Sequence, residues 1–138
     1  PTDWLTADLS AAWTDAEFDI PGDETEIPGA VESVIGGGVL ARLAPWTFSA
    51  CLRHFGEAPL IVDGSVNSGT TTIINPSGSY DWQDVTLSLE LLNATDAEDT
   101  DISYFFESQL PGEASPVEDI HFHPTEPRQV RFSVRYSF

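Results

Sequence analysis

The final segment of the chain alternates strictly between apolar and polar side chains. Val130, Phe132, Val134, Tyr136 and Phe138 occupy every second position, and Arg or Ser fills each position between them. A period of two is typical of a β-strand with one apolar and one polar face. No segment has a period of 3.6 residues, so we predict an all-β fold of about six strands. The other five segments with this period are residues 5–13, 31–43, 46–53, 70–82 and 85–91, of which 31–43 and 70–82 are the weakest.

Three consecutive glycines, residues 36–38, interrupt the second of these predicted strands. Glycine inside a strand often marks a bend or a place where another backbone comes close. We therefore expect one of these two features in the middle of the strand.

Long and short connections alternate between the predicted strands. Outer-membrane β-barrels have this pattern, with short periplasmic turns and long extracellular loops. We therefore expect an antiparallel up-and-down β-barrel of about six meander strands, either part of a larger barrel or a small barrel closed by itself or by oligomerisation. With Phe138 at the periplasmic rim, the long connections face outward and hold most of the acidic residues. The long connections are residues 19–29, 56–69 and 94–128, and the short ones are residues 44–45 and 81–84.

The composition is strongly acidic. The chain has 23 Asp and Glu residues against five Arg and no Lys, which gives a formal net charge of −18. Such a surface repels phosphate backbones, so we expect no nucleic-acid partner. A solvated acidic face is a more common cause of such charge than a specific site.

Length and residue usage bound the organisation of the chain. Its 138 residues are enough for a single domain, residues 1–138, and the lone cysteine, Cys51, excludes an internal disulfide. No run of eighteen apolar residues predicts a transmembrane helix, whereas a transmembrane β-strand needs only about ten alternating residues. The absence of Met and of a signal peptide, with a start at Pro1, indicates a processed or excerpted segment.

The terminal strand is similar to the C-terminal signal that the outer-membrane assembly machinery reads, with Val134, Tyr136 and Phe138 as its signal residues. Residues 119–128, which run into a Glu-Pro-Arg step, resemble the last extracellular loop and final strand of TonB-dependent receptors. Weaker similarities to the same family extend over most of the chain, at residues 1–6, 53–60, 91–96, 101–106 and 110–113.

The resemblance implies a barrel of roughly twenty-two strands around a plug, of which this chain supplies about the last six. It implies that the complete receptor imports scarce nutrients such as iron–siderophore complexes across the outer membrane of a Gram-negative bacterium. The partners implied are the remainder of the barrel and its plug, or self-association, together with outer-membrane lipid and TonB, which would act through a missing N-terminal region. The segment alone is then not transport-competent. The lack of Lys and the residues Ser79 and Asp81, where the family is often basic, depart from its pattern.

Two clusters of polar side chains are candidate metal sites. His121 and His123 would point the same way on an extended strand, and with Asp119 or Glu126 they could bind Zn²⁺ or another transition metal. The favoured alternative is a packed, hydrogen-bonded loop anchor. The second cluster is an acidic run that consists of Asp96, Glu98, Asp99 and Asp101. These carboxylates could bind Ca²⁺, but their spacing lacks the glycine and the closing glutamate of an EF-hand, so a solvated loop is favoured.

No motif indicates an enzyme or a cofactor. The chain contains no G-x-S-x-G or H-E-x-x-H sequence and no phosphate-binding or dinucleotide fingerprint.

The alternative to a receptor segment is a free-standing, acidic, soluble β-barrel that serves as a binding or structural module. Aromatic residues near the predicted strand ends favour interfacial girdles over a soluble core, but only modestly. They are Trp4, Trp13, Trp46, Tyr80, Trp82, Tyr136 and Phe138.

Overall fold

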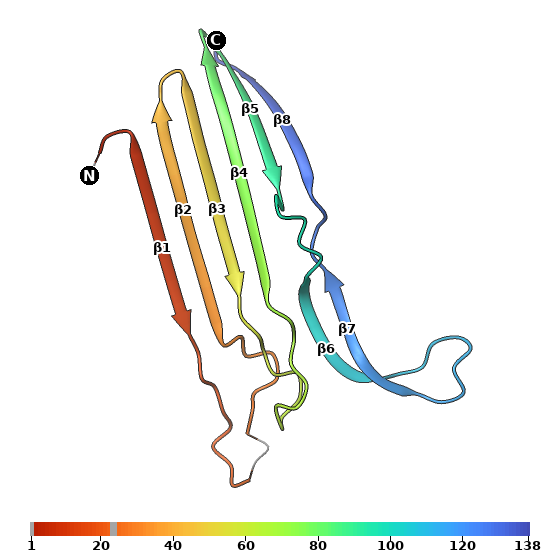
Figure 1. Cartoon of the computed structure of the whole chain (residues 1–138). Coiled ribbons are helices and arrows are strands. Elements are labelled where there is room, and N and C mark those ends of the chain that lie inside the picture. Colours follow the sequence, from red (N-terminus) through yellow and green to blue (C-terminus); the bar gives the residue numbers. More distant parts are fainter. Residues whose placement is uncertain (1, 23–24) are drawn as a thin grey trace.

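The computed structural model describes residues 2–22 and 25–138, which form eight strands and, within these ranges, no helix (Figure 1). The predicted all-β class is therefore confirmed, and each of the six predicted segments forms a strand. The count of about six strands was too low, because the long connection before the final strand contains a hairpin. The strands are β1 (Leu5–Trp13), β2 (Ser33–Leu43), β3 (Trp46–Phe55), β4 (Thr71–Trp82), β5 (Val85–Leu92), β6 (Thr100–Ser108), β7 (Val117–Pro124) and β8 (Gln129–Tyr136).

Six strands form one antiparallel sheet in the order β1-β2-β3-β4-β5-β8, and β6 pairs with β7 in a separate hairpin. Neighbours in the large sheet are consecutive in the chain, except that β6 and β7 are inserted between β5 and β8. The predicted antiparallel up-and-down arrangement is confirmed. Within this chain, however, the sheet stays open and does not close into a barrel, with β1 and β8 as its edges (Figure 1).

The connections of the sheet separate by length (Figure 1). At one end, which we call the turn end, lie the two tight turns at residues 44–45 and 83–84 and the last residues of the chain. At the opposite loop end lie residues 14–22 and 25–32, residues 56–70 and the β6–β7 hairpin. The predicted alternation of long and short connections is confirmed.

The register places most of the apolar residues of the six strands on one face of the sheet. Residues directly opposite each other in an antiparallel pair share a face. Leu9 lies opposite Gly37, Gly37 opposite Leu52 and Leu52 opposite Ile74, so a single row crosses four strands. Rows nearer the turn end continue through Leu89 and Phe132. We call this the apolar face, and the opposite side the polar face.

The three glycines of β2 lie in an unbroken strand, so the expected bend is absent and the close approach is confirmed. A Cβ atom at Gly38 would lie 2.8 Å from the Asp8 carboxylate, and one at Gly37 would lie 3.2 Å from the Asp8 carbonyl oxygen. The missing side chains therefore leave room for β1 to pair with β2 from Ser33 to Ala41.

The sheet exposes its apolar face. Leu9 is 79% exposed, Phe132 64% and Leu89 54%, while polar-face residues such as Ser49 and Ser77 are half-buried and their hydroxyls lie 2.7 Å apart. Among the described residues, the buried ones all lie at the loop end, so the sheet has no apolar core formed by this chain alone. They are Gly56, Ala58, Pro59, Leu60, Thr71 and Asn93.

Candidate functional site

Aromatic rings gather at the turn end of the apolar face. The centroid of the Trp46 ring lies 4.6 Å from that of Tyr80 and 5.9 Å from that of Phe48. Across the sheet, Tyr136 and Phe138 stack at 6.3 Å, and Trp82 is 60% exposed. Two of the three predicted assembly-signal residues therefore belong to this band, and the third, Val134, continues the apolar face on β8 opposite Leu87.

The polar face carries four of the five arginines of the chain. Arg42, Arg53, Arg131 and Arg135 occupy the alternate positions to the apolar residues of β2, β3 and β8. The guanidinium of Arg131 donates a 2.9 Å hydrogen bond to Glu90 across the β5–β8 pair. This face thus suits contact with water.

The β6–β7 hairpin is joined to the sheet at Asn93, which is only 4% exposed and has a left-handed backbone with φ of 47°. Its side-chain amide donates to the carbonyl oxygens of Ala97 and Glu126 at 3.0 and 2.9 Å. Its side-chain oxygen accepts a 2.9 Å hydrogen bond from the N–H of Ala97. Its own N–H donates to the Asn75 side chain at 2.8 Å. Asn93 therefore fixes both chains of the hairpin to β4.

The four carboxylates of the predicted calcium site do not share a binding partner. Asp96 accepts a 2.8 Å hydrogen bond from Arg128, and Asp99 accepts one of 3.3 Å from the N–H of Thr72. Asp101 lies 3.8 Å from the Nδ1 atom of His123, and Glu98 follows Ala97 in the same segment. Asp96 and Asp99 thus help to hold the hairpin root against β4 and β8.

The predicted pair of histidines does lie on one face of β7, since the register puts His121 opposite Tyr104 and His123 opposite Ile102. The His121 ring stacks on Phe106 with a centroid distance of 3.9 Å, as in the packed-anchor interpretation. Its Nε2 atom is buried without a hydrogen-bond partner.

The other two residues of the predicted transition-metal site lie apart from the histidines in their interactions. Asp119 accepts a hydrogen bond from the N–H of Ile120, and Glu126 accepts one from Gln129. Across residues 2–22 and 25–138, the structure brings together no three His, Cys, Asp or Glu side chains that could hold a metal ion.

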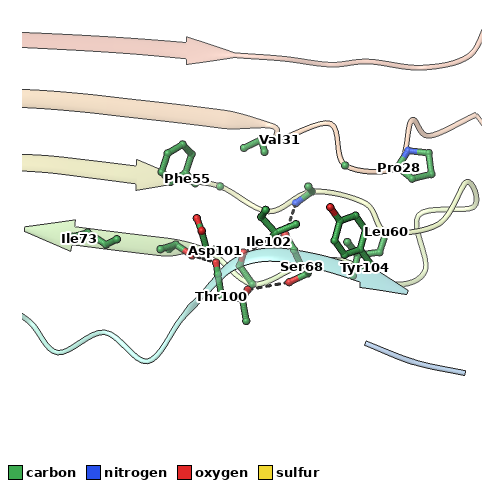
Figure 2. Close-up of a pocket in the computed structure, with 16 residues that line it drawn as sticks. Pro28, Val31, Phe55, Leu60, Ser68, Ile73, Thr100, Asp101, Ile102 and Tyr104 are labelled. Carbon is green, nitrogen blue, oxygen red and sulfur yellow. Dashed lines mark hydrogen bonds between the residues drawn. The ribbon is translucent and has the colours of Figure 1, made fainter. Parts of the chain in front are cut away.

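A cavity of about 450 Å³ lies at the loop end, between three segments that are distant in the sequence (Figure 2). One wall comes from residues 28–31, another from residues 55–60 and 68–73, and the third from residues 100–104 of β6. Its apolar lining includes Pro28, Val31, Phe55, Leu60, Ile73, Ile102 and Tyr104.

Backbone hydrogen bonds fix the two loops that form the first walls. The N–H of Gly29 donates to the carbonyl of Pro59 at 2.8 Å, and that of Glu32 donates to Glu57 at 3.0 Å. The 56–70 loop is closed on itself by a 2.8 Å bond from Leu60 to Val66. The cavity is therefore preformed by two loops that are hydrogen-bonded to each other.

Sequence reasoning missed this cavity, although a signal was present. Phe55 and Ile73 occupy polar-face positions, opposite Thr71 and Arg53 respectively, where the alternation calls for polar side chains. Two large apolar residues out of phase, at the same end of neighbouring strands, indicate a local apolar site on the otherwise polar face.

No protein-family model matches the chain, and a search of the curated proteins finds no match to its sequence. In the described ranges there is also no helix with the length and apolar character needed to span a membrane. What the fold defines is an open, fully antiparallel, amphipathic sheet with a loop-end cavity.

Proposed function

We propose that this chain forms part of the wall of an outer-membrane β-barrel. The observation that carries the proposal is the continuous apolar face, exposed on all six strands. Six strands spaced about 4.8 Å apart and about eight residues long cover roughly 750 Å². Soluble monomers rarely expose a contiguous apolar patch of more than a few hundred Å². The acyl chains of a lipid bilayer would cover such a face.

The strand lengths support the same proposal. A transmembrane β-strand needs about nine to eleven residues, and the strands of the large sheet have between 8 and 12. The aromatic rings at the turn end match an interfacial girdle at one border of the membrane. The polar face then lines the lumen.

The open edges support a larger assembly. In the part of the chain that the structure describes, β1 pairs only with β2 and β8 only with β5. An unpaired strand edge in lipid leaves backbone N–H and C=O groups without partners, which costs several kcal/mol for each group. We infer that further strands, from the same protein or from other copies, complete the barrel.

Within this class, the favoured candidate is a TonB-dependent receptor for nutrients of the iron–siderophore kind, to which this chain contributes the closing strands. The support is the resemblance of residues 119–128 and of the terminal strand, and these residues form β7 and lead into β8. As a wall segment the chain moves nothing by itself. Its long loops take part in ligand capture, and its last strand directs assembly.

The distribution of charge fits an orientation in which the loop end faces the water outside the membrane. Among the acidic residues that the structure describes, only five lie in the large sheet, in its tight turns or ahead of β1, and the others lie at the loop end. A loop end in outside water tolerates this charge, whereas a lipid-facing strand does not. The five are Asp3, Asp8, Asp81, Asp84 and Glu90.

Size-exclusion chromatography of the full chain with and without detergent tests the proposal. We expect aggregation in plain buffer and a defined, detergent-bound species once micelles cover the apolar face. A monodisperse monomer or small oligomer in plain buffer would overturn it and support the free-standing soluble β module.

A further inference from the structure

We propose that the loop-end cavity binds a small organic cation with an apolar ring or alkyl body. The inference rests on the proposed receptor function for its biological meaning, because it names the class of ligand at the outer end. Its physical argument rests on the cavity alone. A volume of about 450 Å³ lies within the usual range for small-molecule sites, which are mostly apolar with a few polar groups.

The Ser and Thr hydroxyls in the wall already have partners. The hydroxyl of Thr71 donates a 2.8 Å hydrogen bond to the carbonyl of Thr100, and the Ser103 hydroxyl donates to that of Thr100 at 3.0 Å. Ser68 accepts a 2.9 Å bond from the N–H of Ala58. What the wall offers a ligand is therefore mainly apolar surface (Figure 2).

Two aromatic rings and one carboxylate set the preferred charge. Phe55 and Tyr104 contribute rings from opposite walls, and Asp101 lies in the same lining (Figure 2). The negative face of an aromatic ring attracts a cation, and the attraction is stronger when the cation is desolvated. Asp101 adds a charge of the favourable sign, and its side chain keeps 64% of its exposure, so a ligand can reach it.

The field of the whole chain has the same sign. A net charge of −18 raises the local concentration of cations and lowers that of anions. Arg53 is on the same face as Phe55, two residues away on β3, but it does not line the cavity. The imidazole of His123 lies 3.8 Å from the Asp101 carboxylate and does not line the cavity.

Isothermal titration at pH 8, with the full chain in lipid nanodiscs or in plain buffer if it is soluble there, tests the inference. The probes are benzyltrimethylammonium, its uncharged analogue with carbon in place of nitrogen, and phenylacetate. We expect the cation to bind with a dissociation constant on the order of 1 mM or below. We expect the neutral analogue to bind several-fold more weakly and phenylacetate not to bind measurably.

Matched variants locate the binding. Asp101→Asn should weaken binding of the cation about fivefold and leave the neutral analogue unchanged, which corresponds to about 1 kcal/mol. Asp119→Asn removes the same charge on β7, outside the cavity lining, and should change neither. Equal binding of all three probes, a preference for phenylacetate, no binding of the cation at 10 mM (roughly ten times the expected constant), or equal effects of the two variants would overturn the inference. Because binding is measured in either medium, its failure is distinct from failure of the membrane proposal.

Discussion

The six-stranded sheet and the loop end place their apolar side chains in opposite ways. On the sheet, Leu9 and Phe132 are more than half exposed while hydroxyls on the other side are half-buried. At the loop end, Ala58 and Leu60 are 5% and 8% exposed, and carboxylates face outward. The loop end thus buries part of its apolar surface within this chain, although the β6–β7 hairpin leaves Tyr104 and Phe122 more than half exposed. The sheet has no fully buried apolar side chain among the described residues.

The comparison explains how one chain can be both strongly acidic and strongly apolar. Burial of apolar surface away from water favours folding at the loop end, where the chain supplies both sides of the contact. On the sheet this chain supplies one side only. The other side must come from lipid or from another apolar surface.

The largest expected effect comes from placing a charge on the apolar face. Leu89→Arg puts a guanidinium on that face in β5, and near the middle of a bilayer this costs about 2–4 kcal/mol. Ser88→Arg puts the same group on the polar face of the same strand and should cost less than about 1 kcal/mol. The inserted fraction of each variant in lipid vesicles, measured against urea, gives both values. Equal effects of the two substitutions would break the distinction between the faces.

A smaller effect is expected at the joint between the two regions. Asn93→Gly keeps the left-handed backbone but loses the side-chain hydrogen bonds to Ala97 and Glu126. The free energy needed to detach the hairpin from the sheet should therefore fall by about 2 kcal/mol. Hydrogen exchange at the Ala97 and Thr125 amides should accelerate accordingly. Thr95→Ala, which removes only one bond of 3.4 Å, is the control. Unchanged exchange in Asn93→Gly would show that the joint is held elsewhere.

The smallest effect is expected at the exposed ion pair of the same joint. Asp96 and Arg128 are both about half exposed, so Asp96→Asn should cost about 0.2–1 kcal/mol and the cost should shrink in high salt. Glu98→Gln removes an equal charge next to the joint and serves as the control. Thermal unfolding at two salt concentrations measures the difference. A salt-independent loss would mean that the 3.2 Å hydrogen bond that Asp96 accepts from the backbone N–H of Arg128 matters more than the charge of Asp96.

The strands of the sheet were predictable because alternation in one segment is a local property. Residues 130–138 and 85–91 reveal a strand without knowledge of its neighbours. The β6 strand was not predicted, because Tyr104, Phe105 and Phe106 are consecutive and break the period of two. Its strand conformation depends on pairing with β7, which the local sequence does not reveal.

The site was less predictable for the same reason. Period two correctly placed His121 and His123 on one face, but the stacking of His121 on Phe106 depends on a cross-strand register that the sequence does not reveal. Likewise, the cavity needs three segments that meet only in the folded chain. Phe55 and Ile73, out of phase on neighbouring strands, are the local trace of it.

The most direct test of the central claim is a spin-label scan of β8. Single cysteines are placed in turn at residues 129–136 in a Cys51→Ser background, and the labelled chains are reconstituted in lipid vesicles. Collisions with oxygen should then peak at Val130, Phe132, Val134 and Tyr136. Collisions with a water-soluble nickel complex should peak at the other four scanned residues, Gln129, Arg131, Ser133 and Arg135. An opposite phase, or no period of two in vesicles, would contradict the account of the apolar face as a lipid-facing surface.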